Sequence, residues 1–155
     1  MANLRLGETR CGSAVFKWGA RTYIMGVINV TPDSFSGDGL SGSVDSAVAL
    51  AKDFAAAGAD VIDVGGESSR PPWAYPGATP VSLDEELRRV MPVIQALVAT
   101  VDLPIRIDTY KAEVARRAIE AGAAMVNDVW ALEKDPDMAA VVAQKRLWWH
   151  KRGFR

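Results

Sequence analysis

Several residue types are scarce in this sequence, and each shortage excludes a class of protein. Cys11 is the only cysteine among 155 residues, so no disulfide forms within the chain, as is usual in a reducing cytoplasm. His150 is the only histidine, which leaves no Cys/His zinc cluster and no Ser-His-Asp triad. There is also no glycine-rich phosphate loop, no apolar run near the roughly 20 residues that span a bilayer, and no signal-peptide pattern. We therefore expect a cytoplasmic protein without a membrane partner.

The remaining composition is that of an ordinary globular protein with enough residues for one domain. Its formal net charge of −1 hides an uneven distribution. Residues 144–155 contain five basic side chains, no acidic one and two of the five tryptophans. This contrast divides the chain into a lead-in at 1–22, a body at 23–143 and a basic tail at 144–155.

The body of the chain alternates apolar runs with amphipathic segments. The pattern predicts strands near 24–30, 61–64, 104–108 and 125–128, and helices near 43–57, 82–98 and 111–121, with a fourth helix from Asp135. The first run shows almost no polar alternation, so we expect a strand buried on both faces. Buried strands alternating with helices predict an α/β fold with a parallel sheet and right-handed crossovers. Four βα units fit either an open sheet or half of an eightfold barrel, and the pattern alone does not choose.

Local signals indicate where helices begin and end. Ser82 and Glu85 form a capping-box pattern at the start of the second helix. Gly58 and Gly122 stand where glycine commonly ends a helix. Pro92 lies inside the second helix and is expected to kink it or to mark a local break. We expect the lead-in at 1–22 to form a small hairpin.

A polar residue lies near the C-terminal end of each predicted strand. These residues are Asn29, Asp63, Asp108 and Asn127. In βα folds such strand ends gather at one side of the sheet, where active sites form. Any one of them alone is as easily a structural group that bonds a backbone amide or caps a helix. Four such residues at one side of the sheet favour a functional site. Buried polar groups need hydrogen-bond partners, and a ligand would supply them.

Four ordered motifs carry a resemblance to a known family. They are Asn-Val-Thr-Pro-Asp-Ser-Phe-Ser at 29–36, Asp-Val-Gly-Gly-Glu-Ser-Ser-Arg-Pro at 63–71, Ile-Asp-Thr-Tyr-Lys at 107–111 and Asn-Asp-Val at 127–129. Together they resemble dihydropteroate synthase, a pterin-binding enzyme of folate biosynthesis, over residues 23–143. The resemblance implies a TIM (β/α)8 barrel, of which this chain would form the N-terminal (βα)4 portion, with parallel strands and outer helices.

The resemblance also implies roles for individual residues. Asn29 would hold Mg²⁺ together with the diphosphate of the substrate, a suitable task for an amide oxygen. Asp108 and Asn127 would bind the pterin, and the charge of Asp108 would favour the cationic pterin that forms when pyrophosphate leaves. We take Asn29, Arg70 and Asp108 as the catalytic candidates.

Loop residues complete the implied site. Arg70 would pair with the pyrophosphate oxygens, next to Ser69, where the family usually has threonine. Pro32 and Phe35 would lie over the site for p-aminobenzoate, for which sulfonamides compete. Without the resemblance, Arg70 would be interpreted as a solvated arginine. The first loop would be interpreted as one that packs on its own apolar residues. The stretch at 71–77 departs from the family, which commonly has Pro-Gly after the arginine.

Three further residues near these motifs are placed outside the site. Asp63 is either a support behind the ligand-binding residues or purely structural. Asp128 is expected to support the end of its strand. Lys111 opens a helix and is expected to be a solvated charge.

The implied reaction joins hydroxymethyl-dihydropterin diphosphate to p-aminobenzoate, which forms dihydropteroate and releases pyrophosphate from the pterin diphosphate. The family's second half supplies further site residues and most of the dimer surface, and none has a counterpart here. We therefore expect little or no turnover from this chain and regard a homodimer as doubtful. Two alternatives stay open: a pterin-binding methyltransferase domain, which does not need the loop at 31–36, and a non-catalytic remnant that binds pterin or sulfonamides.

The tail at 144–155 begins where a fifth strand is due, yet it lacks strand alternation. Three explanations compete: out-of-frame translation, a solvated and disordered terminus, or a surface patch for nucleic acid or membrane. We favour the first because of the basic, Trp-rich composition, and expect neither nucleic acid nor membrane as a partner. Open sheet edges and uncovered apolar strands lead us to expect a marginal chain that aggregates or pairs with itself.

Overall fold

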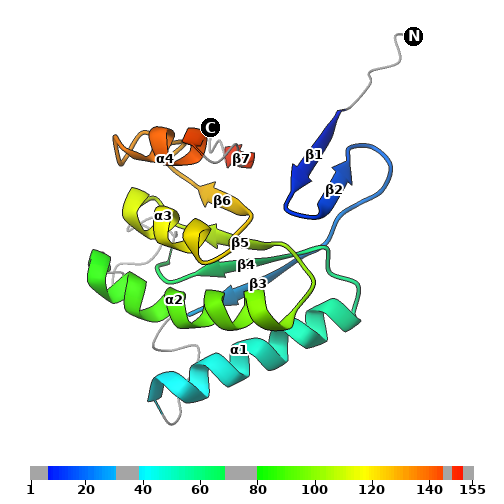
Figure 1. The fold of residues 1–155 in the computed structure, drawn as a ribbon, viewed down its shortest axis with the longest axis horizontal. Coiled ribbons are helices and arrows are strands. Elements are labelled where there is room, and N and C mark those ends of the chain that lie inside the picture. Colours follow the sequence, from blue (N-terminus) through cyan, green and yellow to red (C-terminus); the bar gives the residue numbers. More distant parts are fainter. Residues whose placement is uncertain (1–6, 31–38, 69–79, 145–147, 152–155) are drawn as a thin grey trace.

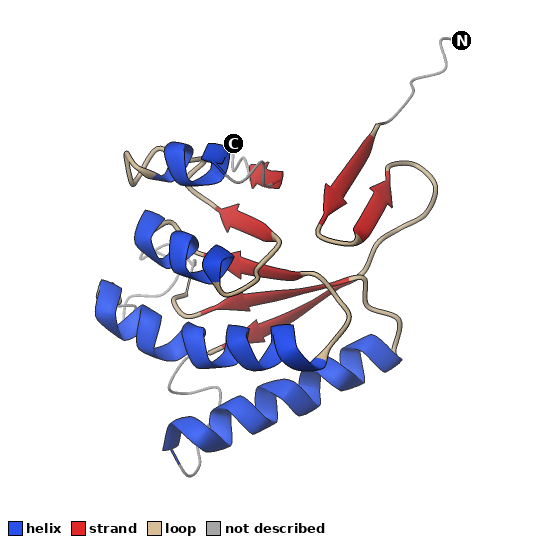
Figure 2. Ribbon diagram, in the orientation of Figure 1, coloured by secondary structure: helices blue, strands red, loops and turns tan. Residues whose placement is uncertain are grey.

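The computed structural model describes residues 7–30, 39–68, 80–144 and 148–151. In chain order the elements are β1 (Glu8–Cys11), β2 (Ala14–Lys17), β3 (Met25–Asn29), α1 (Gly39–Ala56), β4 (Val61–Gly65), α2 (Leu83–Thr100), β5 (Ile105–Asp108), α3 (Ala112–Glu120), β6 (Met125–Asp128), α4 (Met138–Gln144) and β7 (Trp148–Lys151). Strands β1 and β2 form an antiparallel hairpin. The other five strands form one sheet in the order β3-β4-β5-β6-β7, with every pairing parallel. The helices lie together on one side of this sheet (Figure 1, Figure 2), so the expected (βα)4 arrangement is confirmed.

A fifth parallel strand extends the predicted arrangement. Strand β7 comes from the basic tail and pairs with β6, with Met125 opposite Trp148 and Asp128 opposite Lys151. The sequence did not predict this strand, because its residues do not alternate between polar and apolar. Main-chain hydrogen bonds form the ladder of a parallel sheet whatever the side chains, so a strand can form where the alternation is absent.

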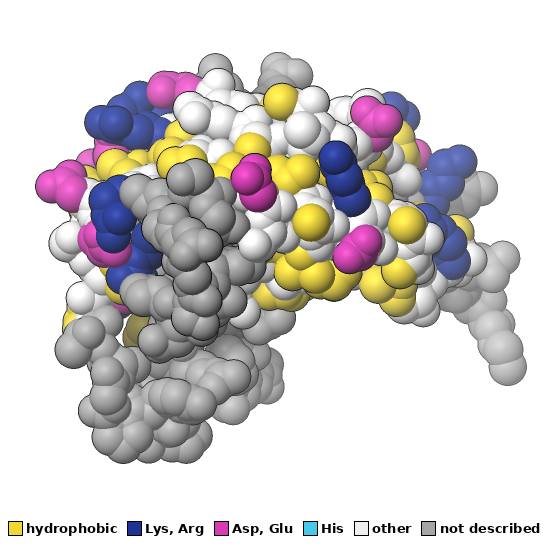
Figure 3. All heavy atoms as spheres, turned by 90° about the horizontal axis from the view of Figure 1, so that it is seen from below, with side chains coloured by type: hydrophobic (Ala, Val, Ile, Leu, Met, Phe, Trp, Pro, Cys, Tyr) yellow, Lys and Arg dark blue, Asp and Glu magenta, His cyan; other side chains and the backbone are white. Residues whose placement is uncertain are grey.

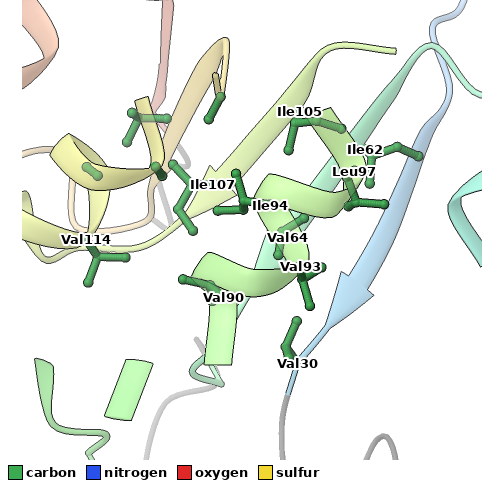
Figure 4. Close-up of a cluster of buried hydrophobic side chains, with 14 of the residues drawn as sticks. Val30, Ile62, Val64, Val90, Val93, Ile94, Leu97, Ile105, Ile107 and Val114 are labelled. Carbon is green, nitrogen blue, oxygen red and sulfur yellow. The ribbon is translucent and has the colours of Figure 1, made fainter. Parts of the chain in front are cut away.

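The main hydrophobic core lies between the sheet and its helices. Helix α2 contributes four fully buried side chains to it: Val90, Val93, Ile94 and Leu97. They meet apolar side chains of β4 and β5, namely Ile62, Val64, Ile105 and Ile107 (Figure 4). Each fully buried Val, Leu or Ile contributes about 1.5–3 kcal/mol relative to an exposed one. This packing fixes β4 and β5, two interior strands of the sheet, and β5 ends at the candidate residue Asp108.

A second, smaller core closes the N-terminal ends of the strands. Cys11 and Phe16 of the hairpin pack with Val61 and Met125, which are the first residues of β4 and β6. The hairpin therefore covers the end of the sheet away from the candidate site. Burial raises the pKa of the Cys11 thiol, as expected for a cysteine that serves as a small apolar residue.

Strand β3 differs from its prediction. It was expected to be buried on both faces, yet Val27 is 45% exposed whereas Ile28 is fully buried. The exposed residues lie on the face that the helices do not cover, and β3 is an edge strand with one neighbour. The apolar run thus has a helix-facing side and an open side. Asn29 shares the open side with Val27, two residues earlier on the strand.

Most helix boundaries agree with the sequence signals to within a few residues. Ser82 is the N-cap of α2, and its Oγ accepts a hydrogen bond from the backbone N–H of Glu85 at 3.2 Å. Only this half of the capping box is present, because the Glu85 carboxylate binds Arg88 and Arg89 instead. Helix α2 continues through Pro92 without a break. Helix α1 begins four residues before Ser43, and α4 begins at Met138, later than the predicted Asp135.

Glycine ends two helices for a conformational reason. Gly58 follows α1 with φ of +89°, and Gly122 follows α3 with φ of +110°. Residues with a Cβ rarely adopt this left-handed region, so glycine is the usual residue there. A Cβ at Gly122 would also lie 2.7 Å from Cγ1 of Val98. Both predicted helix ends are therefore confirmed.

Glu85 should make stability depend on pH in the acid range. Hydrogen bonds from Arg88 and Arg89 lower the pKa of Glu85 to about 2, against roughly 4.3 in an unfolded chain. This stabilisation is present above the unfolded pKa and is lost as the pH falls toward 2. Because the pair is solvent-screened, we expect Glu85→Gln to lower Tm at pH 7 by only about 1–4 °C. Thermal unfolding from pH 7 to pH 2 should show the difference vanish, and a constant difference would contradict this assignment.

The surface retains exposed apolar side chains. Seen from below the view of Figure 1, apolar side chains form a band among charged ones (Figure 3). Among the described residues, Ile24 is 54% exposed and Leu83 is 38% exposed. Apolar surface of this kind can promote association, and the expected tendency to self-pair stays a prediction. Within the ranges that the structure describes, no helix is long and apolar enough to cross a membrane.

Candidate functional site

Three of the predicted site residues stand at one level of the sheet. Asn29 of β3 is opposite Gly65 of β4, Gly65 is opposite Asp108 of β5, and Asp108 is opposite Asn127 of β6. Strands are about 4.8 Å apart, and residues in register point to the same face. The residue before each of the four belongs to the helix-side core: Ile28, Val64, Ile107 and Val126. The four therefore face away from the helices, and we call them the polar rim.

Gly65 places no side chain at the centre of the polar rim. A Cβ at this position would lie 3.6 Å from Cβ of Asp108 and 3.8 Å from Oδ1 of Asn29. A side chain here would therefore fill the space that separates these two polar groups. Glycine leaves this position without a side chain, as is common where a ligand or another backbone segment approaches a strand closely.

The three polar side chains of the rim become more buried from β3 through β5 to β6. The Asn29 side chain is exposed, Asp108 is half-buried and Asn127 is 1% exposed. Oδ1 of Asn127 has no hydrogen-bond partner among the described residues. Leaving a buried acceptor unsatisfied costs about 1–3 kcal/mol, so this position favours a ligand that carries a hydrogen-bond donor. The β6 end of the rim therefore suits a group that carries N–H or O–H donors.

A buried ion pair lies next to the polar rim, two residues earlier on β4 and β5. Asp63 and Arg106 are opposite each other on β4 and β5, and Arg106 Nε lies 3.0 Å from Asp63 Oδ1. Both side chains are less than a tenth exposed, and Arg106 Nη1 also lies 3.2 Å from the sulfur of Met25. This pairing fits both roles expected for Asp63, a support behind the ligand-binding residues and a purely structural group, so the choice between them stays open. Sequence reasoning missed Arg106, although its place between Ile105 and Ile107 indicates the same face as Asp108.

Asp128 supports the end of β6, as predicted. It is fully buried, and its two carboxylate oxygens accept hydrogen bonds from the backbone N–H groups of Trp130 at 2.8 Å and Leu132 at 2.9 Å. The turn that it closes contains Ala131 and Leu132 at positive φ of 61° and 66°. Such backbone is unfavourable without local support. Asp128 supplies that support on the helix side of the sheet.

Lys111 is not the solvated charge that the sequence suggested. Its side chain is only 14% exposed, and Nζ lies 2.5 Å from Glu67 Oε2 and 2.5 Å from Glu86 Oε2. Burial acts to lower the pKa of Lys111, but the hydrogen bonds that its ammonium donates to the two carboxylates outweigh burial and raise the pKa to about 12. The prediction was wrong because both partners are distant in sequence, at separations of 44 and 25 residues.

Several predicted residues lie outside the described part of the chain. Pro32, Phe35, Ser69 and Arg70 fall in the ranges 31–38 and 69–79, so their assigned roles stay predictions. Within the described ranges, no group of three or more His, Cys, Asp or Glu side chains could hold a metal ion. Magnesium needs no such group, because it commonly binds one or two protein oxygens, several waters and substrate phosphates. The exposed amide of Asn29 fits that manner of binding.

Comparison with known proteins agrees with the fold and the motifs. Residues 25–149 match the family described as pterin binding enzyme, and the chain belongs to this family. It is 52% identical over 135 residues to dihydropteroate synthase of Clostridium beijerinckii, covering 87% of this chain and 48% of that protein. The Bacillus subtilis dihydropteroate synthase is 49% identical over 127 residues, covering 82% and 43%. The chain therefore spans about half the length of these curated relatives.

Solved structures show the same relationship. A Clostridium difficile dihydropteroate synthase structure in the presence of pteroic acid has a TM-score of 0.80 at 53% identity, covering 86% of this chain and 49% of that one. The Xanthomonas albilineans dihydropteroate synthase with 4-aminobenzoic acid has a TM-score of 0.81 at 44% identity, covering 96% and 54%. At these identities the likeness extends beyond the general fold to the family, as the sequence motifs had indicated.

Proposed function

We propose that this chain carries the pterin-diphosphate-binding half of a dihydropteroate synthase. The polar rim is the observation that supports this most directly. It presents a carboxylate and a buried amide oxygen at 108 and 127, side by side on neighbouring strands. A pterin ring offers an amino group and ring N–H groups to such acceptors. Asp108 and Asn127 would hold the ring, and Gly65 would leave room for it.

The proposed reaction is the condensation of hydroxymethyl-dihydropterin diphosphate with p-aminobenzoate. Asp108 would stabilise positive charge on the pterin as pyrophosphate leaves, because a fixed carboxylate favours developing cationic character nearby. The amine of p-aminobenzoate would then form the new C–N bond. Arg70 and Ser69 are proposed to bind the diphosphate, and Pro32 and Phe35 to contact p-aminobenzoate or a competing sulfonamide.

Two readouts test this proposal. Calorimetry with 6-hydroxymethylpterin measures ring binding, and turnover with labelled p-aminobenzoate measures condensation. Binding with turnover supports a synthase, and binding without turnover supports the pterin-binding remnant. The absence of pterin binding by folded chain would contradict the proposal. The methyltransferase alternative has no specific observation in its favour.

Magnesium is proposed to bind at Asn29 together with the substrate diphosphate. When bound, the ion would offset the negative charge of the departing pyrophosphate. We expect Mg²⁺ to raise the affinity for the pterin diphosphate and to leave the affinity for 6-hydroxymethylpterin unchanged. Asn29→Ala should abolish the Mg²⁺-dependent gain, measured by titration with and without the ion. An equal gain in Asn29→Ala and the unsubstituted chain would exclude Asn29 as the ligand.

A further inference from the structure

The buried ion pairs around Lys111 connect three separate parts of the fold. Glu67 follows β4, Glu86 lies in α2, and Lys111 precedes α3. We call these three residues the ion-pair cluster. Its three side chains are 16%, 1% and 14% exposed, respectively. Ionic groups at such depth are costly to desolvate, so their contribution to net stability alone does not account for them.

The location of the ion-pair cluster relates it to the polar rim. The register of β4 and β5 ends at Gly65 opposite Asp108. Glu67 lies two residues after Gly65, and Lys111 lies three residues after Asp108. Their ion pair therefore joins the two segments just beyond the point where strand pairing ends.

Neighbouring contacts hold the same segment. The hydroxyl of Tyr110 donates to Glu67 Oε1 at 3.2 Å. Arg89 of α2 donates from Nη1 to the backbone oxygen of Gly66 at 2.9 Å. Glu86 attaches Lys111 to the same helix. The residues that follow Gly65 are thus fixed both to the β5 side and to the helix layer.

The charges of the cluster indicate a positioning role. Two carboxylates share one ammonium, and Glu86 Oε1 has no hydrogen-bond partner among the described residues. An arrangement serving stability alone would gain from removing the surplus negative charge. We propose that the ion-pair cluster positions the ends of β4 and β5, and thereby sets the space between Asn29 and Asp108 in which the pterin binds. This inference rests on the proposed function for its ligand, and on geometry for the positioning itself.

Glu67→Gln is the most informative variant. It keeps the size of the side chain and removes the surplus charge, so the protein should fold with an unchanged or higher Tm. It also weakens the attachment to Lys111, and we expect roughly 10-fold weaker binding of 6-hydroxymethylpterin, since small misplacements of binding groups carry large penalties. Glu133→Gln changes an exposed glutamate in the same way and serves as the matched control. Unchanged affinity in Glu67→Gln would overturn the proposal.

Variants at Lys111 provide a second test. Lys111→Met should lower affinity further, and Lys111→Arg should restore most of it, because it returns the cation. Lys52→Met, on the exposed surface of α1, controls for the loss of a lysine. Loss of affinity in Lys111→Arg equal to that in Lys111→Met would argue against positioning by charge. If Lys111→Met does not fold, Glu67→Gln decides alone.

Hydrogen exchange of the unliganded chain separates this inference from the proposed function. In Glu67→Gln, amides at 66–68 and 109–112 should exchange several-fold faster than in the unsubstituted chain, while those of α1 stay unchanged. Unaltered exchange at these amides would overturn the positioning role. If the unsubstituted chain binds no pterin, the proposed function fails, and the exchange result still decides whether the cluster positions these segments.

Discussion

Replacing Asp108 with asparagine is expected to weaken pterin binding by roughly 10- to 100-fold while the protein still folds. The two side chains have nearly the same size, and Asp108 is half-buried at the open face of the sheet. Asparagine loses the negative charge and presents N–H donors toward the donors of the ring. Calorimetric titration with 6-hydroxymethylpterin, paired with thermal unfolding, measures both effects.

A matched control for Asp108→Asn is available near the other end of the same strand. Asp102 precedes β5 and is exposed, so Asp102→Asn removes one negative charge from the protein away from the polar rim. We expect its pterin affinity to equal that of the unsubstituted chain. Equal affinities for Asp108→Asn and Asp102→Asn would show that Asp108 does not contact the ring.

Alanine should weaken pterin binding at Gly65 and lower stability at the adjacent Gly66. At Gly65 the new Cβ would meet its neighbours at 3.6 Å and 3.8 Å, which is ordinary contact, so Gly65→Ala should fold normally. The methyl group would nevertheless occupy the space between Asn29 and Asp108, and we expect at least about 10-fold weaker pterin binding, because overlap of a bound ring with a fixed atom is not relieved by rearrangement. Thermal unfolding and calorimetry of the same preparation give the comparison.

At Gly66 the effect should fall on stability. A Cβ there would lie 2.6 Å from Cγ1 of Val90 and 3.2 Å from Cγ of Glu86, so the strand and α2 must separate. Overpacking of this kind typically costs about 1–3 kcal/mol, and Gly66→Ala should lower the free energy of unfolding by that amount in urea titrations. If Gly65→Ala were the less stable variant, it would be wrong that Gly65 faces away from the helices and that Gly66 packs against α2.

The fold could be predicted from local signals because they agree with its long-range structure. Apolar runs and helical spacing gave the four βα units, and Gly58 and Gly122 gave helix ends that require positive φ. Strand β7 could not be predicted, since its pairing with β6 depends on backbone hydrogen bonds that leave no side-chain pattern. The open face of β3 was also missed, because an apolar run does not reveal which face the helices cover.

Part of the candidate site followed from the sequence and part did not. Asn29, Asp108 and Asn127 share one level because parallel strands bring their C-terminal ends together, and motif spacing already indicated this. Lys111 and Arg106 were missed for another reason. Their partners are defined by packing between elements that are distant in sequence, and charged side chains in isolation are expected to be solvated.

The most direct test of the pterin site is an NMR titration of isotope-labelled chain with 6-hydroxymethylpterin. The account predicts the largest shifts at the side-chain amide of Asn127 and at the backbone amides of Gly65 and Asp108, with little change in the β1–β2 hairpin. Shifts concentrated elsewhere, or saturable binding that leaves the Asn127 side-chain amide unmoved, would contradict the assignment of the polar rim as the pterin site.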